Sequence, residues 1–133
     1  MKSIREPEFQ SEVLKHSEKV LVNFHAEWCA PCRDQAPIMD SLVAQFQESN
    51  GEGNGIKFIR VDVDENLNLA TLYQVETVPT FILFENGQPV HRVVGLQSED
   101  ALWKIIGVVP ALEAQKSPSG DEVLNFSTVP GSV

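Results

Sequence analysis

The chain has 133 residues, a length typical of one domain that buries enough surface for a hydrophobic core. Hydrophobic residues make up 42% and charged residues 22%, which excludes a wholly disordered or fibrous protein. The 10 Lys and Arg against 19 Asp and Glu give a formal charge of −9, so we expect no binding to nucleic acid or to an anionic membrane surface. The two cysteines lie close together in the sequence and cannot cross-link distant parts of a fold, so they are available for chemistry.

The N-terminal residues are charged throughout and contain neither an apolar run of signal-peptide length nor a small-residue cleavage pattern. The longest apolar stretch, residues 105–112, is interrupted by Pro110 and is far shorter than the ~20 residues that span a bilayer. We therefore expect a cytoplasmic protein with no membrane segment.

Apolar periodicity and turn residues predict alternating helices and strands, which indicates an α/β protein. The apolar run at residues 20–24 predicts a strand buried on both faces. In chain order we expect a helix at 7–16, this strand, a helix at 31–47 kinked by Pro37, a loop at 49–55, a strand at 56–63, a helix at 66–73, strands at 80–84 and 90–94 joined by Asn86-Gly87, and a helix at 99–109.

The composition changes after Pro110. Residues 110–133 contain three prolines and five serines and threonines and show no clear periodicity. We predict a domain over residues 1–110 and a C-terminal tail over 111–133. The tail is either flexible or docked on the domain or a partner through its few apolar side chains.

Cys29 and Cys32 lie in Trp28-Cys29-Ala30-Pro31-Cys32, which follows the predicted buried strand and begins the next helix. Unpaired N–H groups and the dipole at a helix N-terminus stabilise a thiolate, so we expect Cys29 to be nucleophilic. Cys32 is close enough to form a disulfide with Cys29, and we expect it to sit deeper. An inert pair or half of a zinc site are the alternatives, but the chain has three histidines and no second cysteine pair, so we predict no metal.

This motif, placed between a strand and a helix, resembles the active site of the thioredoxin family. The resemblance covers most of the chain, and it implies the thioredoxin fold, a central mixed β-sheet flanked by helices. The later features that carry it are Pro37 in the helix, Val78-Pro79-Thr80 as the family's cis-proline loop, Asn86-Gly87 as its hairpin turn and Gly95 as its substrate-groove glycine.

The resemblance implies protein-disulfide reduction by thiol–disulfide exchange, with Cys29 as nucleophile and Cys32 as resolving cysteine. It implies no cofactor beyond the redox-active Cys29–Cys32 disulfide. The implied partners are disulfide-containing proteins and a separate electron donor of the thioredoxin-reductase type, and we expect a monomer. The implied substrate groove consists of Trp28, Ala30, Pro31, Val78, Pro79 and Gly95.

Several residues depart from the family pattern near the two cysteines. Asn23 stands where most thioredoxins have a buried aspartate, so Cys32 loses its proton more slowly or to another base, unless Asn23 is simply a satisfied core residue. Arg60 falls near a common lysine, and without the aspartate its charge could meet solvent or Asp62, although a partly exposed arginine at a strand end is the more common case. His25 shares a strand face with Asn23 and could buffer protons, although a passive surface residue is the more common case.

These departures leave alternatives to a general reductase. Asn23, together with Ala30 in place of the usual glycine, favours a more oxidising dithiol oxidase or isomerase, which the absence of an export signal disfavours. A redox-responsive adaptor with low turnover is the alternative from another class. The leading prediction is a cytoplasmic protein-disulfide reductase.

Overall fold

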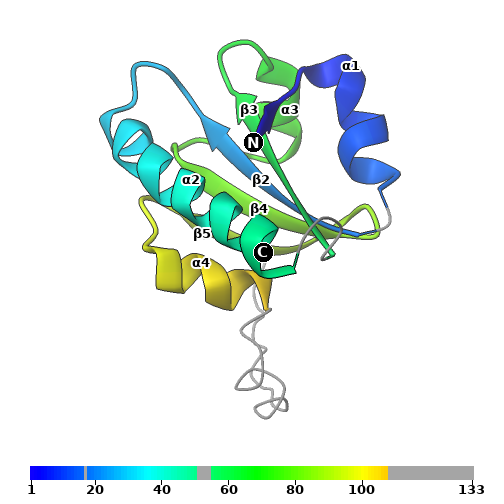
Figure 1. Cartoon of the computed structure of the whole chain (residues 1–133). Coiled ribbons are helices and arrows are strands. Elements are labelled where there is room, and N and C mark those ends of the chain that lie inside the picture. The colour runs from blue at the N-terminus through cyan, green and yellow to red at the C-terminus, as the bar shows by residue number, and fades with distance from the viewer. Residues whose placement is uncertain (17, 51–54, 108–133) are drawn as a thin grey trace.

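The computed structural model describes residues 1–16, 18–50 and 55–107, so the predicted tail lies outside the described residues. A five-stranded sheet lies at the centre, in the order β1-β3-β2-β4-β5 (Figure 1). β1, β2 and β3 are parallel, whereas β4 is antiparallel to both β2 and β5, so the sheet is mixed as predicted. The strands are β1 (Lys2–Ser3), β2 (Lys19–His25), β3 (Ile56–Asp62), β4 (Thr80–Glu85) and β5 (Gln88–Val94).

Helices cover both faces of this sheet. On one face lie α1 (Glu6–Phe9), which continues into the π-helical turn η1 (Gln10–Leu14), and α3 (Leu67–Leu72). On the other face lie α2 (Ala30–Asn50) and α4 (Glu99–Ile106), seen side by side in Figure 1. This three-layer arrangement confirms the predicted α/β class.

Alternating side chains of the central strands build a separate apolar cluster on each face. Val22 and Phe24 of β2 pack with Ile82 of β4 toward α1 and α3. Leu21 and Phe81 belong to the cluster under α2 and α4. Each large side chain buried in this way contributes about 1.5–3 kcal/mol of transfer free energy. β2 is therefore buried on both faces, as its apolar run predicted.

The same alternation positions the polar residues of β2. Because side chains two apart share a face, Asn23 and His25 follow Leu21 on the α2 side of the sheet. The parallel register sets Asn23 beside Arg60 and His25 beside Asp62 of β3. The apolar cluster thus gives way to a polar group at the end of β2 that leads into α2.

The structure confirms most predicted elements and corrects some boundaries. Asn86 and Gly87 have φ of 52° and 81°, as a two-residue hairpin turn requires. α2 runs on through residues 49–50, which were expected in the loop; residues 51–54 lie outside the described ones. α4 ends earlier than predicted, at the left-handed Gly107, and the two-residue β1 was missed because both its residues are exposed and polar.

Trp103 lies off the apolar stripe of α4, yet it stacks on Phe46 of α2, with ring centroids 4.9 Å apart.

No helix within the described residues has the length and apolar character needed to cross a membrane.

Glu12 of η1 forms ion pairs with Lys57 at 2.6 Å and Lys2 at 2.9 Å, which hold the pKa of its carboxyl at about 2. Since this pKa is depressed, the pairs stabilise the fold above pH 4.5 and are lost as the pH falls toward 2. We expect Glu12→Gln to remove up to about 1 kcal/mol at pH 7 and almost nothing near pH 2. Urea unfolding of both proteins across this range checks it, and an equal difference at both ends of the range would contradict it.

Candidate active site

Cys29 and Cys32 form a disulfide where α2 begins, with Cα atoms 5.2 Å apart. Cys29 directly precedes the first residue of α2, and the backbone N–H of Cys32 donates to Cys29 Sγ at 3.1 Å. Side-chain acceptors at this position satisfy unpaired N–H groups of the first helical turn. The same N–H would stabilise negative charge on Cys29 Sγ once the disulfide is reduced.

The relative burial of the two cysteines differs from expectation. Cys29 is 3% exposed, whereas Cys32 is partly exposed, so the prediction that Cys32 sits deeper is wrong for the oxidised protein. The reason lies in the loop before β4, because the Val78 carbonyl oxygen lies 3.5 Å from Cys29 Sγ. Cys32 instead faces a cavity on the other side of the helix start.

The structure brings the predicted groove residues to the disulfide. The Val78–Pro79 peptide bond is cis, as predicted. The Gly95 N–H donates to the Pro79 carbonyl at 2.8 Å, which joins the loop before β4 to the chain after β5. Trp28 is 66% exposed, and its Nε1–H donates to Asp64 Oδ2 at 2.7 Å. Ala30 and Pro31 are also exposed beside the disulfide.

Sequence analysis missed two residues that hold this groove together. Asp64 fixes the Trp28 ring, and no sequence pattern singled it out. Gln35 is fully buried in α2; its Nε2 donates to the Gln97 carbonyl at 2.9 Å, and its Oε1 accepts from the Gln97 N–H at 2.8 Å. Its spacing to Met39 and Leu42 puts this glutamine on the buried stripe of the helix, a signal that could have found it.

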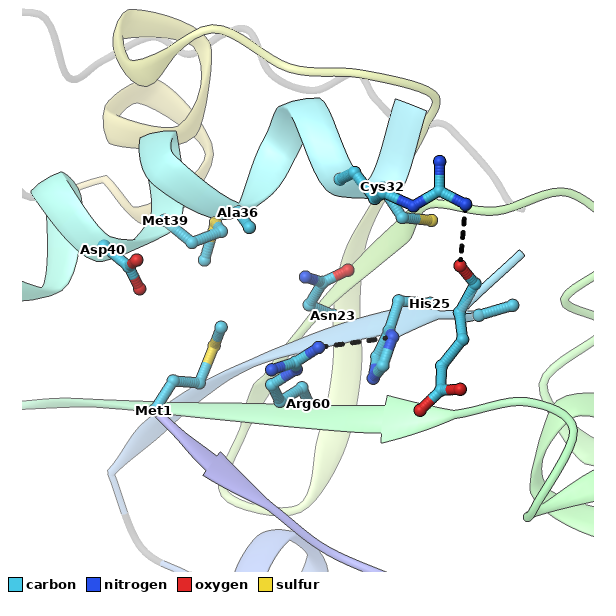
Figure 2. Close-up of a pocket in the computed structure, with 11 residues that line it drawn as sticks. Met1, Asn23, His25, Cys32, Ala36, Met39, Asp40 and Arg60 are labelled. Atoms are coloured by element: carbon cyan, nitrogen blue, oxygen red, sulfur yellow. Dashed lines mark hydrogen bonds between the residues drawn. The ribbon is translucent and has the colours of Figure 1, made fainter. Parts of the chain in front are cut away.

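A cavity of about 260 Å³ lies beneath the disulfide on the α2 side of the sheet. Figure 2 shows Cys32 at its upper edge, Asn23 in the middle, and His25 and Arg60 below. The two β2 residues therefore share the cavity, as their spacing predicted.

The electrostatic environment of these side chains corrects two expectations. His25 is 7% exposed and not a surface residue, and burial first, then the Arg60 charge, lowers its pKa. Arg60 is partly exposed near the end of β3, as expected, and its Nη2 lies 3.4 Å from His25 Nδ1. Asn23 is buried, yet its Oδ1 has no hydrogen-bond partner among the described residues, so it is not a fully satisfied core amide.

A redox-active cysteine pair at the start of a long helix, facing a cis-proline loop across a mixed sheet, defines a thiol–disulfide oxidoreductase. The chain carries its own redox group in this disulfide. Among the described residues, no cluster of three or more His, Cys, Asp or Glu could hold a metal ion.

Comparison with known proteins agrees with this class. The thioredoxin family model matches residues 1–107. Thioredoxin of Mycobacterium tuberculosis is 36% identical over 110 residues, covering 82% of this chain and 90% of that protein. The solved structure of Fasciola hepatica thioredoxin superposes with a TM-score of 0.68 and 30% identity, covering 80% of this chain and 96% of that one. The chain belongs to the thioredoxin family.

A longer relative matches over the same part of the chain. The bifunctional thioredoxin reductase/thioredoxin of Mycobacterium leprae is 36% identical over 110 residues. The match covers 82% of this chain but 23% of that protein, so the chain corresponds to less than a quarter of its length.

Proposed function

We propose that this protein reduces protein disulfides, with Cys29 as nucleophile and Cys32 as resolving cysteine. The Cys29 thiolate attacks a substrate disulfide, and a mixed disulfide forms as one substrate thiolate leaves. Cys32 then attacks Cys29 Sγ, closes the Cys29–Cys32 disulfide and releases the second substrate thiolate. The observation that supports these roles is the Cys32 N–H donated to Cys29 Sγ, since it stabilises charge on the first cysteine only.

We propose that an extended substrate segment binds across the groove beside the disulfide. Trp28 supplies an exposed apolar face, and Val94 and Leu96, each about half exposed, flank Gly95. Backbone groups of Val78 would pair with the substrate main chain in the manner of an added strand. The full set of proposed substrate-binding residues is Trp28, Ala30, Pro31, Val78, Pro79 and Gly95.

We propose that electrons come from a separate thioredoxin-reductase-type donor and that the protein works as a cytoplasmic monomer. The M. leprae relative joins the two activities in one chain, which supports a donor of this kind. The formal charge of −9 favours partners with basic surfaces over nucleic acid or anionic lipid.

Insulin reduction by dithiothreitol tests the reductase proposal. The full chain is expected to accelerate the precipitation of reduced insulin, and a Cys29→Ser/Cys32→Ser double variant is not. No acceleration, together with binding of a partner that depends on the oxidation state, would favour a redox-responsive adaptor instead.

A more oxidising dithiol is the second candidate, and the site gives it a specific basis. The cavity beside Cys32 is lined by the neutral amide of Asn23, where most thioredoxins have an aspartate, and by the positively charged Arg60. Positive charge favours thiolates and therefore stabilises the reduced form. A reduction potential near that of general disulfide reductases, about −270 mV, supports the reductase, whereas one near −120 mV supports the oxidase.

Residues 1–110 are proposed to form the catalytic domain, with 111–133 as an appended tail. The family model ends at residue 107, which supports this boundary. A truncation after Pro110 that keeps full insulin turnover agrees with the proposal, and a large loss would give the tail a role in activity.

The Trp28–Asp64 hydrogen bond leads to a prediction about substrate affinity. Asp64→Ala frees the exposed indole, and an exposed bond worth about 0.5–1 kcal/mol corresponds to a roughly two- to fivefold higher KM with kcat little changed. Steady-state kinetics with a protein disulfide measures both constants. Glu65→Ala, at the adjacent exposed carboxylate, is the matched control, and an equal rise in its KM would contradict a specific role for Asp64.

A further inference from the structure

Buried polar groups without partners line the cavity beneath Cys32. Among the described residues, Asn23 Oδ1, His25 Nε2 and Arg60 Nε are buried and have no hydrogen-bond partner. Such atoms are rare in folded proteins, and each one calls for an explanation. All three belong to side chains that line the same cavity as Cys32 (Figure 2). All three atoms therefore belong to side chains beside the space that Cys32 faces.

The contact with Arg60 determines the protonation of His25. A guanidinium can only donate hydrogen bonds, so His25 Nδ1 accepts from Arg60, and the neutral ring carries its proton on Nε2. Burial and the Arg60 charge lower the pKa of His25, which keeps the ring neutral at pH 7. A further proton on Nδ1 would point at the guanidinium. His25 is thus a hydrogen-bond donor through Nε2 and a poor base.

Among the described residues, no carboxylate of α2 or of the chain before it forms an ion pair with Arg60. Glu27 and Asp40 also line the cavity, but both are exposed to solvent. Arg33 is exposed as well and donates to the Glu27 carbonyl at 3.3 Å. The Met1 side chain lies at the end away from Cys32 (Figure 2).

Charged groups of β3 do not pair with Arg60 either. Asp62, two residues further along the strand, lies in register with His25, and its Oδ1 accepts from the Asp64 N–H at 2.9 Å. None of the ion pairs formed by the described residues includes Arg60. The lining of the cavity therefore includes, besides the acceptor Asn23 Oδ1, one cation and the His25 Nε2–H donor, and these two groups suit a negative charge on Cys32.

We propose that Arg60 stabilises the Cys32 thiolate when the mixed disulfide is resolved, and that His25 is the positioning residue that holds the guanidinium toward the cavity. The proposal rests on the proposed role of Cys32 as resolving cysteine. Cys32 releases its proton to solvent, its thiolate attacks Cys29 Sγ, and the bond between Cys29 and the substrate sulfur breaks. The substrate leaves as a thiolate with the electron pair and then takes up a proton from solvent.

Asn23 is essential to this arrangement because it carries no charge. A carboxylate at this position would lie beside Arg60 across the β2–β3 ladder and would neutralise it. It would also place a negative charge beneath the thiolate, which raises the pKa of a thiol. Asn23→Asp is therefore expected to raise the pH at which the Cys32 thiolate forms, an equilibrium effect distinct from the rate at which Cys32 loses its proton.

Stopped-flow mixing of the reduced full chain with one equivalent of an aryl disulfide, whose thiolate product is coloured, tests the proposal. The first thiolate released reports attack by Cys29, and the second reports attack by Cys32 on the mixed disulfide. Arg60→Gln is expected to move the pH inflection of the second phase up by about one unit and to slow that phase about tenfold at lower pH. Arg60→Lys is expected to keep the inflection near its original position, as is Arg33→Gln, which removes an exposed cation at the same cavity.

Two substitutions of His25 separate positioning from proton transfer. His25→Gln retains an acceptor for the guanidinium and is expected to preserve the inflection, whereas His25→Phe raises it. An unchanged inflection in Arg60→Gln would overturn the proposal, and so would loss of the inflection in both His25 variants, which would make His25 the base. A wild-type protein without a Cys32-dependent second phase would instead refute the proposed function. Circular dichroism spectra matching the wild type show that the variants fold.

Discussion

Cys32→Ser is expected to reduce insulin turnover to the rate given by dithiothreitol alone while leaving the attack by Cys29 intact. The serine backbone N–H still donates to Cys29 Sγ, so the nucleophile keeps the hydrogen bond that stabilises its thiolate. Because no second sulfur is available, the mixed disulfide between Cys29 and the substrate cannot be resolved. Mass spectrometry of the variant mixed with an aryl or protein disulfide should show one substrate sulfur bound per chain.

Cys29→Ser is the matched control for this experiment. It retains the resolving cysteine but removes the proposed nucleophile, so it is expected to form little mixed disulfide near neutral pH. In the oxidised protein Cys32 is partly exposed, whereas Cys29 is almost fully buried. Comparing the two single variants therefore tests which cysteine is the nucleophile independently of exposure. Rapid trapping of substrate on Cys32 in this variant, with none on Cys29 in Cys32→Ser, would reverse the two roles.

Local pattern was sufficient to predict most of the fold. The apolar run of β2 predicted a strand buried on both faces, and the Asn86-Gly87 turn predicted the hairpin of β4 and β5. The short strand β1 was not predictable in this way. β1 exists only because a parallel partner, β3, supplies its hydrogen bonds, and a two-residue polar segment carries no periodicity of its own.

The candidate site was less predictable, because its properties depend on contacts between distant segments. Asn23 and His25 are two residues apart on a strand, which predicts that their side chains lie on the same face of the sheet, and the structure confirms it. The burial of His25 and its contact with Arg60 depend on α2 covering that face, which no local pattern specifies. The low exposure of Cys29 likewise arises from the loop at Val78, nearly fifty residues further along the chain.

Gln35→Met is expected to produce the largest loss of stability among substitutions close to the groove. The side chain is 0% exposed, and its amide accepts from the N–H of Gln97 and donates to the carbonyl of the same residue. Methionine fills a similar volume but leaves both backbone groups of Gln97 unpaired. Each group left unpaired costs about 1–3 kcal/mol when fully buried, and because Gln97 is only partly buried we expect a total loss of about 2–4 kcal/mol. Thermal unfolding should show a midpoint about 10 °C lower.

The same substitution should also weaken substrate binding, because Gln97 anchors the segment that follows Gly95. Gln97 Nε2 donates to the Gly95 carbonyl at 3.2 Å, so a loosened Gln97 frees the groove edge as well as the helix contact. KM for a protein disulfide is therefore expected to rise more than kcat falls. Gln88→Met, at an exposed position of β5, is the matched control and should change stability by less than about 0.5 kcal/mol. Equal midpoints for the two variants would show that the amide of Gln35 does not hold α2 to the groove.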